Sequence, residues 1–144
     1  MGAYAELIAY QRETEALGQV AGRLSWDQET MMPRGAAAQR AEESAAMQGV
    51  LHARRSDPRI ADWLAAAEAE LAQDDTVARA QLREIRRGYE RTLKVPAALA
   101  MALARETALA QGIWAEARAE EDVARFLPAL SEVLRLRREE GAAL

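Results

Sequence analysis

The sequence predicts an all-α fold, an antiparallel bundle of five or six helices whose first helix is long. Alanine accounts for 34 of the 144 residues, and together with leucine, glutamate and arginine it gives a composition typical of helices. Apolar residues recur in steps of three and four along most of the chain. No segment alternates between apolar and polar residues for long enough to form a strand.

The first helix is expected from about Ala3 to Met31. Residues in alternating steps of three and four form one mostly apolar seam suited to packing on a neighbouring helix, namely Ala3, Leu7, Tyr10, Thr14, Leu17, Ala21, Leu24, Gln28 and Met31. Gly18 and Gly22 lie four residues apart in this segment and would allow another backbone to approach closely. Pro33 and Gly35 then end the helix.

A second helical pattern runs from about residue 36 to residue 54. Asp57 and Pro58 follow it as a restart signal, because aspartate can cap a third helix and proline suits the first helical position. Asp74 or Asp75 is expected to cap a fourth helix, which carries an apolar face of its own.

Pro96 breaks the chain and starts a fifth helix, and Asp122 is expected as the N-cap of the last one. Pro128 lies inside this last segment, where it predicts either a late helix start or a kink. Trp63 and Trp114 lie within apolar patterns, so we expect both indole rings to pack in the core.

Composition excludes several classes of protein. The chain has no cysteine, which excludes a disulfide framework and a thiol nucleophile and is compatible with the cytoplasmic location that we expect. No run of 18 apolar residues is present to span a membrane. The net charge of −4 and the pI near 5.2 argue against nucleic acid as a partner.

A self-contained zinc site is excluded as well. Catalytic zinc usually takes three protein ligands, but the chain has one histidine, His52, so the H-E-x-x-H motif is absent. A di-iron site needs a glutamate three residues before each ligating histidine, and that position is Gly49. We therefore expect His52 to bond the last carbonyls of its own helix, and we assign no catalytic, cofactor-binding or metal-binding residue.

The predicted fourth helix contains the most basic stretch of the chain. Arg83, Arg86, Arg87 and Arg91 fall near one another at helical spacing. One interpretation is an anion-binding face beside a substrate groove. The other is a solvated or ion-paired face, because glutamates interrupt the arginines, and we favour it for the isolated chain.

The segment from Leu24 to Pro33 combines uncommon residues with polar ones at a helix end. Its distinctive members are Trp26, Asp27, Gln28, Glu29, Met31 and Pro33. From physical chemistry alone we expect a helix terminus with a structural role. In it, Trp26 would anchor the core, and Asp27 or Glu29 would bond nearby backbone.

The stretch LSWDQETMMPRGAAAQRAEE, residues 24–43, resembles the N-terminal signature of the carboxypeptidase Taq (M32) family of metallocarboxypeptidases. The resemblance continues in the same order over nearly the whole chain. Its further segments are SDPRIADWLAAAEAEL (56–71), REIRRGYERTLKVPAALAMALARET (83–107) and QGIWAEARAEEDVARFLPALSEVLRLRREE (111–140).

This resemblance implies one part of a larger, almost wholly helical enzyme. Family members are several times longer, use zinc to remove C-terminal residues from peptides, and are commonly homodimers. Their H-E-x-x-H helix, a further zinc-binding glutamate and their substrate-binding motifs lie far downstream. No catalytic or zinc-binding role therefore transfers to a residue of this chain, and the matching region is implied to cap one side of the active-site groove.

Two hypotheses about function follow. In the first, residues 1–144 are a single helical domain, the truncated N-terminal region of a zinc carboxypeptidase, inactive alone. Its partners would be the remainder of the peptidase and, in the full-length enzyme, peptides and a second subunit, and zinc would belong to the parent enzyme. The alternative is a free-standing helical protein-interaction domain without enzymatic activity.

Overall fold

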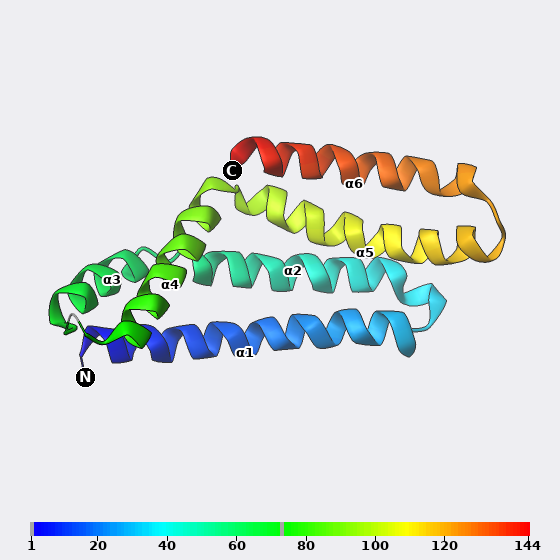
Figure 1. The fold of residues 1–144 in the computed structure, drawn as a ribbon. Helices are drawn as coiled ribbons and strands as arrows, with labels where there is room; N and C mark the ends of the chain where they lie inside the picture. The colour runs from blue at the N-terminus through cyan, green and yellow to red at the C-terminus, as the bar shows by residue number, and fades with distance from the viewer. Residues whose placement is uncertain (1, 73) are drawn as a thin grey trace.

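The computed structural model describes residues 2–72 and 74–144, and within them it confirms the all-α prediction (Figure 1). These residues contain no strand, and none of their helices is both long and apolar enough to cross a bilayer. The elements are α1 (Ala3–Thr30), the short 3₁₀ helix η1 (Arg34–Ala36), α2 (Ala37–Arg55), α3 (Arg59–Glu70), α4 (Thr76–Lys94), α5 (Ala97–Ala119) and α6 (Val123–Ala143).

The helices α1, α2, α5 and α6 run antiparallel in a row, and α3 and α4 lie at one end of it (Figure 1). The most extensive contacts join α2 to α5 and α5 to α6, followed by those of α1 with α2 and α3. Consequently α1 and α6 form the two edges of the row. Because α5 is its main neighbour, α6 fully buries only Leu136 among its described residues.

Apolar side chains form two clusters at different places in the row. The larger cluster joins α1, α3 and α4, and its buried members are Leu7, Ile60, Leu64, Ala67 and Leu82. The smaller one joins α5 and α6 through Leu99, Leu103 and Leu136. Each fully buried leucine contributes about 1.5–3 kcal/mol relative to an exposed one. Between the clusters, α2 and α5 bury small side chains, namely Ala41, Ala45, Ala100 and Ala108.

The helices α2 and α5 approach each other closely at Gly49. A Cβ atom at this position would lie 3.1 Å from the sulfur of Met101 on α5. The close approach expected at Gly18 and Gly22 was wrong. A Cβ atom at Gly22 would have no neighbour within 4 Å, and one at Gly18 would meet only the Arg55 guanidinium, at 3.7 Å. Both glycines lie beside the apolar seam of α1, not in it.

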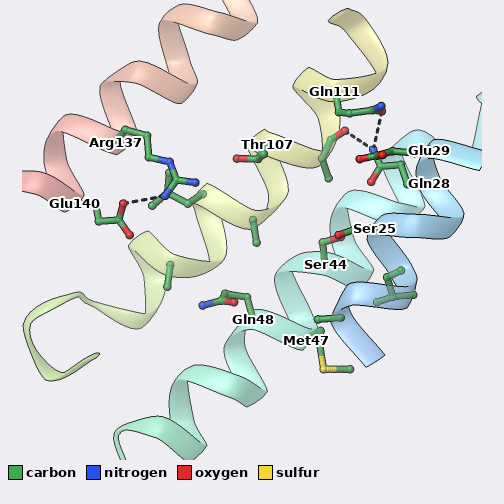
Figure 2. A pocket seen from close by; sticks show the side chains of 16 residues that line it. Ser25, Gln28, Glu29, Ser44, Met47, Gln48, Thr107, Gln111, Arg137 and Glu140 are labelled. Carbon is green, nitrogen blue, oxygen red and sulfur yellow. Dashed lines mark hydrogen bonds and ion pairs between the residues drawn. The ribbon is translucent and has the colours of Figure 1, made fainter. Parts of the chain in front are cut away.

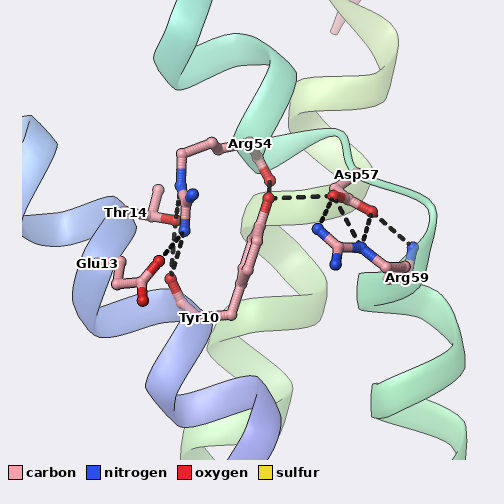
Figure 3. Close-up of polar contacts among 6 residues, drawn as sticks. All are labelled: Tyr10, Glu13, Thr14, Arg54, Asp57 and Arg59. Carbon is pink, nitrogen blue, oxygen red and sulfur yellow. Dashed lines mark hydrogen bonds and ion pairs between the residues drawn. The ribbon is translucent and has the colours of Figure 1, made fainter.

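A polar corner attaches the end of α2 to α1 (Figure 3). The Tyr10 hydroxyl lies 3.1 Å from the Arg54 carbonyl and 3.2 Å from the Asp57 carboxylate, both of which can accept its proton. The Arg54 guanidinium lies over the Tyr10 ring and donates to the Thr14 hydroxyl at 3.0 Å and to the Glu13 carboxylate at 3.1 Å. Thr14, the buried polar residue of the seam, is thereby satisfied.

Arg59 completes this corner from the first turn of α3. Its side chain donates to both carboxylate oxygens of Asp57, and its backbone N–H donates to one of them at 2.9 Å. These bonds, with the Arg59 side chain as the largest cause, lower the pKa of Asp57 from 3.8 to about 2. The sequence predicted that Pro58 would be the first helical residue, but α3 begins at Arg59. Asp57 therefore lies one residue before the N-cap position and bonds the Arg59 N–H from there.

The predicted caps of the later helices are confirmed. Asp75 accepts a hydrogen bond from the Ala78 N–H at the start of α4, and Asp122 accepts one from the Arg125 N–H at the start of α6. Pro128 lies inside α6, which begins at Val123, so a late start of this helix is excluded.

Two side chains lie where the sequence did not predict. Trp114 is 47% exposed, so its expected place in the core was wrong, whereas Trp63 is partly buried beside Tyr10. His52 bonds the Val95 carbonyl at the end of α4, at 2.7 Å, and not a carbonyl of its own helix. The carbonyl of His52 itself already accepts from the N–H and hydroxyl of Ser56.

We expect Tyr10→Phe to lower the free energy of unfolding by about 1–2 kcal/mol, because it removes a partly buried hydroxyl that bonds two acceptors. Tyr89→Phe is the matched control, since the Tyr89 hydroxyl bonds no side chain or carbonyl in the described part of the chain. Urea unfolding of both variants checks this. Equal losses of unfolding free energy in the two variants would contradict a stabilising role for the Tyr10 hydroxyl.

Asp57→Asn should reveal the pH dependence of the same corner. A carboxylate whose folded pKa lies below its usual value stabilises the fold above that usual value, and this contribution is lost as pH falls from about 4 to 2. The stability gap between the parent chain and Asp57→Asn should therefore be largest at neutral pH and should narrow over this range. Glu90→Gln, at an exposed carboxylate, is the control. A stability difference between the parent chain and Asp57→Asn that does not change with pH would contradict the lowered pKa of Asp57.

Candidate functional site

One side of the helical row is hollowed. A first hollow of about 370 Å³ is bounded by α1, α2, α5 and α6 (Figure 2). A second, of about 560 Å³, is bounded mainly by α2 and α4. Gln48, Ala100 and Glu140 line both, so the two hollows are neighbours. We refer to them together as the polar groove.

The lining of the polar groove contains groups that can hydrogen-bond to a ligand. The first hollow is lined by small side chains, by Leu24, Met47 and Leu103, and by polar groups that include Gln28, Gln48, Gln111, Arg137 and Glu140 (Figure 2). A side-chain amide such as that of Gln48 can bond the backbone of an extended chain. No three His, Asp or Glu side chains of the described residues lie close enough together to hold a metal ion.

Charges of both signs enter the second hollow. Arg55 and Arg91 line it from the ends of α2 and α4, and Glu84 and Glu140 line it from α4 and α6. His52 is also present, but its Nε2 atom is engaged with the carbonyl at the end of α4. The first hollow is likewise lined by charges of both signs, from Glu29, Arg137 and Glu140, so the two hollows are similar in this respect.

Gln28 fixes the end of α1 across the groove. Its amide nitrogen donates to the Ala108 carbonyl at 2.7 Å and lies 3.4 Å from the amide oxygen of Gln111 (Figure 2). Both partners belong to α5 and follow Gln28 in the sequence by 80 and 83 residues. The single glutamine in the distinctive segment therefore connects an edge of the row directly to its centre.

Asp27 is held by a residue that the sequence did not single out. Arg40 on α2 pairs with the Asp27 carboxylate and with Glu43, and it donates to the Leu24 carbonyl. Only 11% of the Arg40 side chain is exposed. The i, i+3 spacing of Arg40 and Glu43 was a weak sequence signal, but nothing in the sequence pointed to Asp27 as the third partner.

The remaining members of the segment occupy different environments. Trp26 is 63% exposed and Met31 is 71% exposed, so the expected core anchor was wrong. The physical reason is that Arg40 and Gln28 hold this end of α1 by other faces of the helix, leaving the indole in solvent. Glu29 lines the polar groove, and Pro33 precedes η1 as its N-cap.

The four arginines of α4 do not act as one face. Arg83 and Arg87 are strongly exposed and approach Glu84 at 3.4 and 3.9 Å, distances typical of weak surface pairs. Arg86 pairs at 2.8 Å with Glu68 of α3. Of the four, Arg91 is the one whose side chain lines the polar groove.

We expect Gln28→Met to lower the free energy of unfolding by about 1 kcal/mol, because the Ala108 carbonyl loses its side-chain donor. Gln19→Met is the matched control on the same helix, since Gln19 bonds only Glu15, one turn away and exposed. Thermal unfolding of both variants measures the difference. A smaller effect at Gln28 than at Gln19 would show that the connection to α5 contributes nothing.

Comparison with known proteins gives consistent matches along the whole chain. The family model described as carboxypeptidase Taq (M32) metallopeptidase matches residues 6–144. Thermostable carboxypeptidase 1 of Thermus thermophilus is 40% identical over 144 residues, covering 99% of this chain and 28% of that protein. Metallocarboxypeptidase 1 of Trypanosoma cruzi has a similar structure, with a TM-score of 0.70 and 30% identity over 98% of this chain and 28% of the other.

The chain therefore spans little more than a quarter of the length of these relatives. The match includes the segment with Gln28 and Asp27, the arginines of α4 and all of α5 and α6. Sequence identity and the shared helical arrangement both group the chain with these carboxypeptidases. It belongs to the carboxypeptidase Taq (M32) metallopeptidase family.

Proposed function

We propose that this chain is the N-terminal helical region of a zinc-dependent carboxypeptidase, where it covers one side of the substrate groove and supplies no catalytic residue. One observation carries the proposal. Nearly the whole chain matches a carboxypeptidase, yet it corresponds to only 28% of that enzyme. In such an arrangement, the reacting groups would come from the other part of the protein.

The few side chains of this chain that could bind a metal ion agree with a catalytic centre supplied by the other part of the protein. The family description implies a metal ion, but the sequence has one histidine and no cysteine. In residues 2–72 and 74–144, no three His, Asp or Glu side chains converge. The residues present do not fit a zinc site, so the zinc ligands and the group that activates water would lie outside the 144 residues.

The polar groove supports the covering role. It is open, bounded by helices and lined by glutamine amides, small side chains and charged groups, among which an extended peptide could find partners for its backbone. Arg91, at the other end of the groove, adds a positive charge that can attract a peptide carboxylate. Binding and exclusion of bulk water are the contributions that these residues would make.

The test is a chimera in which residues 1–144 replace the matching region of Thermus thermophilus carboxypeptidase 1. We expect the isolated chain to release no C-terminal amino acid from a peptide in the presence of zinc, because it has no ligand set. The chimera should release C-terminal amino acids and should lose this activity with a chelator. Activity of the isolated chain would contradict the proposal, and so would an inactive chimera.

Two charge reversals in the chimera separate the groove from the rest of the surface. Arg91→Glu should raise KM by about tenfold while leaving kcat nearly unchanged, since it alters attraction and not chemistry. Arg87→Glu, at an exposed arginine of the same helix, should leave both constants unchanged. Equal effects of the two reversals would favour the alternative of an interaction domain unrelated to substrate.

A further inference from the structure

We propose that an apolar stripe on α6 is the surface on which the catalytic part of such a carboxypeptidase packs. The stripe consists of Val123, Leu127, Leu130 and Leu134. This inference rests on the proposed function and adds to it the location of the contact and the chemistry of the partner, an apolar face of the catalytic part.

The stripe follows directly from helical geometry. Its members are separated by four, three and four residues, and at about 100° per residue they fall within a narrow arc of the helix. Val123 is 70% exposed, Leu127 is 50% exposed and Leu134 is 42% exposed, while Leu130 is partly buried. Single exposed apolar residues are ordinary, but four on one helical face form a contiguous patch.

The other side of α6 has the opposite character. Arg125 pairs with Glu116 and Glu120, and Arg135 pairs with Glu132 and Glu139. These ion pairs lie far around the helix from the stripe: those of Arg125 join α6 to the end of α5, and those of Arg135 lie within α6. The helix therefore has a side that contacts α5 and an apolar side for which no other element of the described residues is an extensive neighbour.

The length of the relatives identifies the occupant. The match to the Thermus enzyme covers 28% of it, so nearly three quarters of such an enzyme lies outside this region and could pack on it. As an edge of the row, α6 is open to that contact (Figure 1). A second copy of this chain is a poorer occupant, because four side chains along about 17 Å of helix provide far less than the 1,200–2,000 Å² of a standard interface.

Cysteine labelling in the chimera described above tests the proposal, because this chain has no cysteine of its own. Leu127→Cys places a thiol in the stripe, and Glu139→Cys places one on the ion-paired side as the matched control. Labelling by a maleimide would be followed by mass spectrometry of the peptide that carries each thiol. In the isolated chain, both thiols should react at similar rates.

In the chimera, Leu127→Cys should react at least about tenfold more slowly than in the isolated chain, and Glu139→Cys should keep its rate. If the Leu127→Cys chimera is unfolded by circular dichroism, Leu134→Cys replaces it. An active chimera with unchanged labelling of the stripe would overturn this surface while leaving the proposed function intact. An inactive chimera would overturn both, and labelling of the isolated chain that slows with concentration would assign the stripe to a second copy.

Discussion

The close packing of α2 against α5 is the contact on which the rest of the architecture depends. Alanines on both helices and Gly49 opposite Met101 allow the two backbones to approach, so large side chains are unnecessary at the centre of the row. Each of these helices then has one further main neighbour, α1 beside α2 and α6 beside α5. The outcome is an open row with a groove on one side and an apolar stripe at one edge.

The two ends of α1 are fixed by polar contacts that complement this alanine-rich centre. Near its start, Tyr10 and Arg54 exchange bonds across the end of α2, and Asp57 is a second acceptor for the Tyr10 hydroxyl. At its other end, Gln28 reaches α5 and Asp27 is held by Arg40. A helix attached at both ends makes a stable wall, which is what an open groove requires if its width is to be maintained.

Local features of the fold could be predicted from sequence, because they depend on neighbours along the chain. Asp75 and Asp122 cap the helices that they were expected to cap, and the seam of α1 holds except at Met31. Tertiary partners could not be predicted, because spacing shows which residues share a face but not what covers that face. The solvent exposure of Trp26 and the contact of His52 with α4 are the clearest cases.

The central claim is that residues 1–144 form a wall of the substrate groove while the chemistry takes place on residues from elsewhere. A crystal structure of the chimera with zinc and a bound peptide inhibitor tests it most directly. We predict that every zinc ligand lies outside residues 1–144 and that the peptide faces the polar groove beside Gln28 and Gln48. A zinc ligand supplied by His52 or Glu140, or a peptide bound away from the groove, would contradict the claim.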